Sequence, residues 1–368
     1  MANLVLYRKY RPQQFKEVVG QEHVVITLTN ALKQGIVSHG YLFSGPHGCG
    51  KTTIARLLAK SLNCEKRKKE DFEPCCSCDS CLEIKENRAI DLIEIDAASN
   101  RGIDEIRDLK EGIKFRPSKS KYKIFIIDEA HQLTKEASNA LLKTLEEPPS
   151  HAIFILATTE IHKMIPTIQS RCQGFNFRKL KQEEIVKRLK GILEKEKIKY
   201  EEEALNLIAQ KASGAQRDAE TLLDEAISFS SNKVIEKETV RMLLGTADIS
   251  SLFTFITFLA EKDTKKGIDF LNNLIFQGID LKEFSMSLLE YLRKILILKI
   301  DKEAENYLLP SLTPEEKQII QDLALRFSGS EIKRAIERFM QAEEKMRFTS
   351  IIQLPLELAV VDVCQKNQ

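Results

Sequence analysis

Residues 41–52 read YLFSGPHGCGKT, and this stretch decides the fold. An apolar run leads into a turn with three glycines that ends at Lys51, and the helical pattern TTIARLLAKSL then begins at Thr52. The turn matches the phosphate-binding pattern GxxxxGK[ST], in the strand-to-helix context that this pattern requires. Its glycines let backbone N–H groups converge on phosphate oxygens, and the helix start adds the positive end of its dipole. The stretch therefore predicts a strand, a nucleotide-phosphate site and a helix.

The side chains of this loop have separate predicted tasks. Lys51 reaches the β- and γ-phosphates of a nucleotide, and the Thr52 hydroxyl is a ligand for Mg²⁺. Cys49 is interpreted as a small filler. The predicted nucleotide-binding residues of the loop are Gly45, Pro46, His47, Gly48, Cys49, Gly50, Lys51, Thr52 and Thr53.

A second apolar run, KIFIIDEAH at 123–131, supplies the acidic residues that are expected to act together with the loop. It delivers Asp128 to the metal ion and Glu129 to an attacking water. Two adjacent acids with separate tasks favour hydrolysis by water over transfer to a substrate hydroxyl. The sequence therefore predicts an ATPase more than a kinase.

Outward from these motifs, residues 1–178 alternate β-rich runs with helical stretches, which is typical of an α/β domain with a mostly parallel sheet. Four runs are continuously apolar, as expected when helices cover both faces of the sheet. These predicted strands are YLFS (41–44), DLIEID (91–96), YKIFIID (122–128) and AIFILAT (152–158). A fifth, GFNFR (174–178), is shorter and is expected at an edge of the sheet.

From Lys179 the strand pattern gives way to helical periodicity. Residues 182–243 predict three or four helices, two of which end at Gly214 and Gly245. Residues 246–368 are predicted to be helical as well. The chain thus divides into a nucleotide-binding domain at 1–178, a small helical domain at 179–245 and an all-helical domain at 246–368.

Composition excludes several classes of protein. The 368 residues include 56 Lys and Arg against 54 Asp and Glu, so the net charge is +2. No whole-chain positive field is available for unspecific binding to nucleic acid or membrane, and any nucleic-acid contact must be local. No apolar run reaches the ~18 residues of a membrane span, and the amino terminus shows no apolar run before its charges. A cytosolic protein without a membrane partner is expected.

Five of the eight cysteines lie between Cys64 and Cys81. Four of them follow C-x10-C-x2-C-x2-C, and two overlapping CxxC steps can wrap thiolates around one tetrahedral ion. Four sulfurs with no open position predict structural zinc, and Cys76 is the leftover thiol. Redox chemistry and inert buried thiols are the alternatives. The predicted zinc ligands are Cys64, Cys75, Cys78 and Cys81.

Further motifs add a family resemblance. Thr158 ends the strand after the acidic motif, Ser170-Arg171-Cys172 follows, and Gly214-Ala-Gln-Arg217-Asp218 lies in the helical region. With the two nucleotide motifs, these resemble a clamp-loader-type AAA+ ATPase. YRKYRPQQFKEVVGQEH at the start, LLKTLEEPP at 141–149 and the cysteine cluster narrow the resemblance to the gamma/tau family of bacterial DNA polymerase III clamp-loader subunits.

The resemblance implies an AAA+ domain with a zinc-binding insertion at 64–81, a helical lid at 179–245 and a helical collar for oligomerisation at 246–368. It also implies roles for single residues. Thr158 is the first sensor of the γ-phosphate or the water, Arg171 is an arginine finger for a neighbouring subunit, and Arg217 is the second sensor. The implied adenine pocket comprises Tyr10, Arg11, Pro12, Val18 and Val19. Pro46, His47 and Ala215-Gln216 depart from the family pattern without removing a required donor or ligand.

The function implied is that of an ATP-driven motor subunit, with ATP, Mg²⁺ and Zn²⁺, that opens a sliding clamp and places it on primed DNA in the bacterial cytoplasm, at the nucleoid-associated replisome. Delta and delta prime type subunits and copies of the chain itself are the implied partners. Partners of the family's longer form, helicase and polymerase, are not expected. A non-hydrolysing scaffold and another AAA+ machine, a branch-migration motor or helicase loader, are the alternatives.

DNA contact is implied for one segment, DAASNRGIDEIRDLK at 96–110. In the resemblance it lines a central chamber, where Asn100, Arg101 and the start of the following helix could meet backbone phosphates. A solvated helix start capped by Asp104 or Asn100 is the alternative.

Overall fold

The computed structural model describes residues 5–68, 70–99, 112–113, 115–230, 234–244, 249–301 and 314–365. Their contacts divide the chain into two compact units, residues 1–237 and 238–368. Asn100, Arg101 and Asp104 of the predicted DNA segment lie outside the described residues, and so does the predicted helix end at Gly245.

The first unit is built on the predicted parallel sheet. Its five strands run in the order β2-β3-β4-β1-β5. The strands are β1 (Gly40–Ser44), β2 (Leu92–Asp96), β3 (Lys123–Asp128), β4 (Ala152–Thr158) and β5 (Gln173–Asn176). All five predicted strands are confirmed to within about two residues at their ends, and β5 lies at an edge as expected. Because all the pairings are parallel, the carboxyl ends of the strands share one edge of the sheet.

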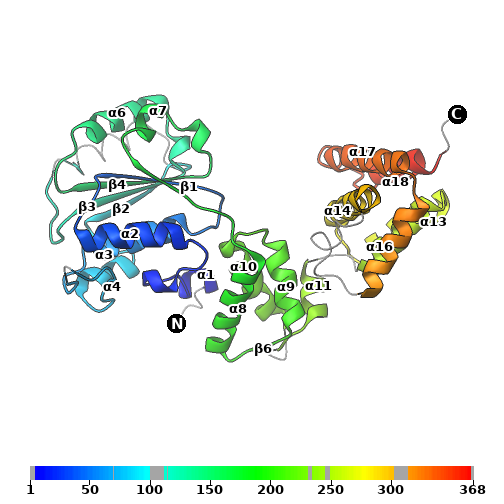
Figure 1. Cartoon of the computed structure of the whole chain (residues 1–368), viewed down its shortest axis with the longest axis horizontal. Coiled ribbons are helices and arrows are strands. Elements are labelled where there is room, and N and C mark those ends of the chain that lie inside the picture. Colours follow the sequence, from blue (N-terminus) through cyan, green and yellow to red (C-terminus); the bar gives the residue numbers. More distant parts are fainter. Residues whose placement is uncertain are drawn as a thin grey trace. The chain divides into compact units, whose positions relative to one another are not determined.

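Helices cover both faces of this sheet. α2 (Glu22–Gln34) and α3 (Lys51–Leu62) lie against one face (Figure 1). α6 (Lys135–Glu146) and α7 (Pro166–Gln169) lie against the other, where their apolar side chains join those of β3 and β4 in one core cluster. β1 and β4 are buried along their whole length, which explains why they read as continuous apolar runs.

Strand β2 departs from that expectation. Its side chains are half-buried or exposed throughout, so the prediction that helices bury both of its faces is wrong. Its position explains the difference, because β2 is one of the two edge strands and pairs only with β3.

Three helices follow the sheet within the first unit. They are α8 (Gln182–Glu196), α9 (Glu202–Lys211) and α10 (Gln216–Phe229), and α11 (Lys237–Leu244) begins where the two units divide. The predicted helical region also holds a feature that periodicity missed. β6 (Lys199–Tyr200) and β7 (Val234–Ile235) form a parallel pair, and two residues are too few to show alternation.

The second unit is helical over its described residues, as predicted. Its helices after α11 are α12 (Ile249–Ala260), α13 (Thr264–Phe276), α14 (Leu281–Ile300), α16 (Pro314–Arg326), α17 (Gly329–Met346) and α18 (Leu354–Cys364). Phe255, Phe284 and Phe339 meet in its core. Across the described parts of both units, no helix combines the length and the apolar character that a membrane span requires.

Candidate functional site

The glycine-rich loop connects β1 to α3 in a conformation that depends on glycine. Gly45 and Gly48 have φ of 147° and 70°, in the region that L side chains rarely adopt. A Cβ at Gly45 would lie 2.4 Å from the carbonyl oxygen of Phe177, and one at Gly48 would lie 2.8 Å from the Cβ of Ala215. The loop is therefore packed tightly on both the strand side and the helical side of the site.

The side chain of Lys51 lies across this loop. The residue is 6% exposed, and its Nζ donates to the carbonyl oxygens of Gly45 and Pro46, each at 2.8 Å. These bonds hold the ammonium group beside the start of α3, where the loop N–H groups and the helix dipole favour an anion. The position suits a cation that reaches the phosphates of a nucleotide.

The two residues predicted to hold Mg²⁺ are brought together. The Oγ1 atom of Thr52 donates to Oδ2 of Asp128 at 2.8 Å, across the gap between α3 and the end of β3. An oxygen pair of this kind is the donor set that Mg²⁺ prefers, with water and phosphate oxygens completing the shell.

Glu129 follows Asp128 with φ of 47°, a left-handed conformation for a residue with a side chain. Its Oε2 accepts from Oγ1 of Thr159 at 2.9 Å and from the backbone N–H of Thr159 at 3.2 Å. The acid is thus anchored to the residue directly after β4. Glu129 lines the cavity that Lys51 also lines.

Thr158, the predicted first sensor, is fully buried at the end of β4. Its Oγ1 accepts from the backbone N–H of Glu160 at 3.1 Å and bonds Nδ1 of His131 at 3.0 Å. Sequence analysis assigned no role to His131, although it is the last residue of the motif KIFIIDEAH. Neither Thr158 nor His131 lines the cavity, but Nδ1 of His131 lies 3.4 Å from Oε2 of Glu129, which does.

A cavity of about 360 Å³ joins these parts, which is the size of a small-molecule site. The sequence-predicted residues that line it are Arg11, Pro12, Val18, Val19, His47, Gly48, Cys49, Gly50, Lys51, Thr52, Thr53, Asp128, Glu129 and Arg217. The lining residues that sequence reasoning missed are Tyr7, Glu17, Asp96, Ala98, Leu180, Arg188, Gln216 and Glu220. The cavity is thus walled by the sheet, the N-terminal segment and the helices after the sheet.

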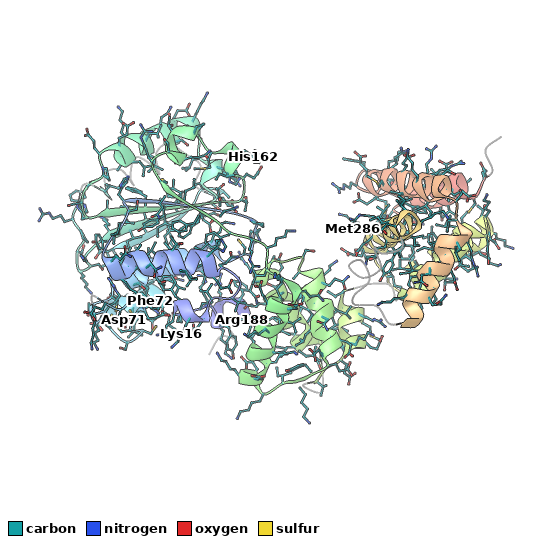
Figure 2. All side chains as sticks on the ribbon, viewed as in Figure 1. Lys16, Asp71, Phe72, His162, Arg188 and Met286 are labelled. Atoms are coloured by element: carbon teal, nitrogen blue, oxygen red, sulfur yellow. The ribbon has the colours of Figure 1, made fainter. Side chains whose placement is uncertain are left out.

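Charged groups from the helices close one side of the cavity. The guanidinium of Arg217, near the start of α10, lies 4.9 Å from the ring centroid of Tyr7. Arg188 of α8, labelled in Figure 2, pairs its Nε with Oε1 of Glu220 at 3.2 Å and donates to the carbonyl of Tyr10. Burial raises the pKa of Glu220, and the Arg188 guanidinium opposes that shift.

Arg11 adds a further positive charge to this wall. Burial lowers the pKa of its guanidinium, and the nearby Arg56 acts in the same direction. A mostly buried cation that lines a cavity favours an anionic occupant, because the occupant supplies the charge that solvent no longer screens.

Other predicted site residues lie elsewhere. The hydroxyl of Tyr10 donates to Oε1 of Glu196 at 2.6 Å, outside the cavity lining. Arg171 follows α7, and its guanidinium donates to Oε1 of Glu146 at 2.6 Å and to the carbonyl of Thr167 at 2.9 Å. Arg171 does not line the cavity of its own chain. Gly45 and Pro46 shape the loop without lining the cavity.

The four predicted metal ligands form a compact cluster. The Sγ atoms of Cys64, Cys75, Cys78 and Cys81 all lie within 4.8 Å of one another, and those of Cys75 and Cys81 are 3.9 Å apart. A tetrahedral ion with metal–sulfur bonds of about 2.3 Å places its sulfurs about 3.8 Å apart. The cluster therefore fits one metal ion.

Backbone groups in the cluster favour the thiolate form of Cys75, whereas burial raises the pKa of Cys64 and Cys81. Although burial opposes it, the N–H groups of Ser77 and Cys78 point at Sγ of Cys75 from 3.4 and 3.3 Å and lower its pKa to about 6. Cys76 lies outside the cluster with φ of 58°, and its Sγ is 3.4 Å from the carbonyl oxygen of Gln13. The leftover thiol thus faces the N-terminal segment.

Comparisons with known proteins agree along the whole chain. Three family models match: "DNA polymerase III, delta subunit" at residues 20–181, "DNA polymerase III clamp loader subunit, ATPase lid domain" at 184–232, and "DNA polymerase III subunits gamma and tau domain III" at 235–368. The chain is 42% identical to the tau subunit of Bacillus subtilis, over all of this chain and 64% of that protein.

Two further relatives give the same picture. The gamma subunit of Buchnera aphidicola subsp. Schizaphis graminum is 43% identical over 80% of each chain. The tau subunit of Escherichia coli is 42% identical over 83% of this chain and 47% of that protein. The chain thus spans about half to two thirds of the tau subunits that it matches.

Proposed function

Because the chain belongs to the gamma/tau family of DNA polymerase III clamp-loader subunits, we propose that it is an ATP-hydrolysing motor subunit that loads a sliding clamp onto primed DNA. One observation carries the proposal: Lys51, the Thr52–Asp128 pair and Glu129 converge on one cavity. A scaffold that only binds nucleotide would not need the acid Glu129 beside that pair.

The residues of the cavity have separate roles in hydrolysis. Loop N–H groups and Lys51 bind the phosphates. Thr52 and Asp128 would hold Mg²⁺, which would supply positive charge to neutralise the charge that develops on the phosphoryl oxygens. Glu129 orients the attacking water. Thr158 is the first sensor, and it acts through His131, which bonds Thr158 and lies beside the carboxylate of Glu129.

The rest of the cavity wall is assigned to the adenine base and to the helical lid. Pro12, Val18 and Val19 supply apolar lining for the adenine, while Tyr10 supports this wall through its carbonyl bond to Arg188. Arg217 is the second sensor, which brings the lid onto bound nucleotide. These roles follow the family, and the shared cavity supports them.

Arg171 serves the ATP site of a neighbouring subunit. Its guanidinium lies outside its own cavity, half-exposed and paired with Glu146, so it is available at the surface. The neighbours are delta and delta prime type subunits and further copies of this chain. Residues 1–178, 179–245 and 246–368 then act as AAA+ domain, lid and oligomerisation collar within a cytoplasmic replisome.

The ATPase rate of the purified chain tests this function. Alone, the chain is expected to hydrolyse ATP slowly, because its sites lack a neighbour's arginine. Partner subunits should raise the rate, and primed DNA with the sliding clamp should raise it further. A rate of zero in every mixture would indicate a scaffold. Hydrolysis that the clamp does not stimulate would indicate another AAA+ machine, such as a branch-migration motor.

We also propose that the cysteine cluster holds one structural zinc ion. Cys78→Ser removes a ligand from a closed four-sulfur site and is expected to lose the metal, whereas Cys76→Ser should keep it. Elemental analysis of the purified variants measures the zinc content per chain. Zinc lost from the Cys76 variant but kept by the Cys78 variant would overturn the ligand set.

A further inference from the structure

The cysteine insertion, residues 64–81, contacts the N-terminal segment at residues 13–16. The carboxylate of Glu73 accepts from the backbone N–H groups of Phe15 and Lys16 at 2.8 and 2.9 Å, one on each oxygen. Gln14 donates from its side-chain amide to the carbonyl of Pro74 at 3.4 Å. Every residue of the short segment therefore contacts the insertion, Gln13 through the Cys76 thiol described above.

Buried side chains reinforce these bonds. Phe15 is 1% exposed, and its ring lies 6.5 Å from that of Phe72 in the insertion. Lys60 of α3 is 2% exposed, and its Nζ donates to Oε1 of Gln13 at 2.9 Å and lies 3.3 Å from Sγ of Cys76. Figure 2 labels Phe72 and Lys16 on the same side of the sheet.

Segment 13–16 lies between two parts of the cavity wall. Arg11 and Pro12 line the cavity immediately before it, and Glu17, Val18 and Val19 line it immediately after. The phosphate end of the cavity is fixed by the glycine loop. Beside the charged Arg11 and Glu17, this wall carries the apolar Pro12, Val18 and Val19, and we place the base, the less polar part of a nucleotide, against these three.

From these contacts we infer that the cysteine insertion sets the base-side wall of the nucleotide cavity, with Glu73 as the positioning residue, so that metal occupancy and nucleotide affinity are coupled. This inference rests on the proposed ATP site. Glu73 stands two residues before Cys75, a cluster ligand, and no flexible linker separates the cluster from the wall. Loss of the metal frees the Cys75 end of the insertion, and with it the carboxylate that fixes Phe15 and Lys16.

Coupling of this kind is reciprocal. If bound metal raises the affinity for ATP by some factor, then bound ATP raises the affinity for the metal by the same factor. Inorganic tripolyphosphate should not take part, because it contacts the glycine loop and leaves the base-side wall empty.

Glu73→Gln tests the inference in the full chain. The variant keeps the shape of the side chain but loses the charge that accepts both N–H groups. Calorimetric titration with Mg-ATP is expected to show about a tenfold rise in Kd, as for the loss of a hydrogen bond to a charged group. The Kd for Mg-tripolyphosphate should stay at the parent value. Glu70→Gln, which removes an exposed carboxylate from the same insertion, is the matched control and should change neither Kd.

A second measurement keeps the inference testable if Glu73→Gln loses some stability. Equilibrium competition with a zinc chelator gives the zinc affinity of the parent chain with and without ATP. ATP should raise that affinity in the parent but not in Glu73→Gln. Unchanged ATP affinity in Glu73→Gln, equal losses for ATP and tripolyphosphate, or a zinc affinity indifferent to ATP in the parent would each overturn the inference. A parent chain that binds no ATP would instead overturn the proposed function itself.

Discussion

Arg171→Ala is expected to bind ATP almost as the parent does and to lower hydrolysis in the assembled complex by about 10³ to 10⁵-fold. The guanidinium neutralises charge that spreads over the phosphoryl oxygens in the transition state. Arg171 makes its contacts with Glu146 and Thr167, outside the cavity of its own chain, so the rate that falls belongs to a neighbouring site. Steady-state ATPase assays of the complex and titration of the isolated variant with nucleotide measure the two quantities.

Arg178→Ala is a matched control for this prediction. Arg178 also makes an ion pair, with Glu184, and its side chain is 38% exposed against 32% for Arg171. Deleting such a surface arginine should change the rate only a few-fold. In mixed assemblies, activity should disappear at the site next to an Arg171→Ala subunit. Equal losses in the dilute monomer and in the complex would place Arg171 in its own site, and the oligomeric mechanism would have to be abandoned.

Lys51→Ala should weaken nucleotide binding by about ten- to a hundredfold and lower hydrolysis still further. A hydrogen bond between charged groups contributes about 1.5–3 kcal/mol, and 1.4 kcal/mol is tenfold in affinity. The cation also stabilises the transition state, where the phosphoryl charge is greatest, so the rate falls more than the affinity. Titration with ATP and single-turnover hydrolysis separate the two effects.

The fold must survive for Lys51→Ala to be informative. Lys51 donates to the carbonyls of Gly45 and Pro46 and itself lines the cavity, so water that fills the space left by its side chain can bond both carbonyls. Thermal unfolding of the variant and the parent should therefore differ little. A variant that hydrolyses ATP at the parent rate would show that the loop at 45–52 is not the phosphate site.

Much of the nucleotide site could be predicted from sequence because its parts are local. β1, the glycine loop and α3 are consecutive in the chain. The single pattern GxxxxGK[ST] therefore identifies Lys51 and Thr52 and predicts the conformation of the loop. Asp128 and Glu129 could be added because parallel buried strands read as apolar runs, and the carboxyl ends of such strands meet at one edge.

The residues missed from the cavity wall have a different origin. Tyr7, Arg188 and Glu220 reach the site from three helices far apart in the sequence. Tyr7 lies in a four-residue helix, which is too short to show a pattern. Arg188 and Glu220 sit in amphipathic helices with many similar charges, and only the packing of α8 and α10 selects one arginine and one glutamate from them. The exposure of β2 was missed for a similar reason, because the local composition of a strand does not reveal its position in the sheet.

Contact between Gly48 and the helical region has a mechanical consequence. The backbone N–H of Gln216 donates to the carbonyl of Gly48 at 3.0 Å, and the absent Cβ of Gly48 leaves the space that Ala215 occupies. The loop is therefore in direct contact with the first turn of α10, a helix of 14 residues. At 1.5 Å per residue α10 is a lever about 21 Å long, so a tilt of about 5° at the loop swings its far end by about 2 Å. If phosphate binding shifts the loop by tenths of an ångström, the helix would magnify that shift into a larger displacement without any relay of side chains.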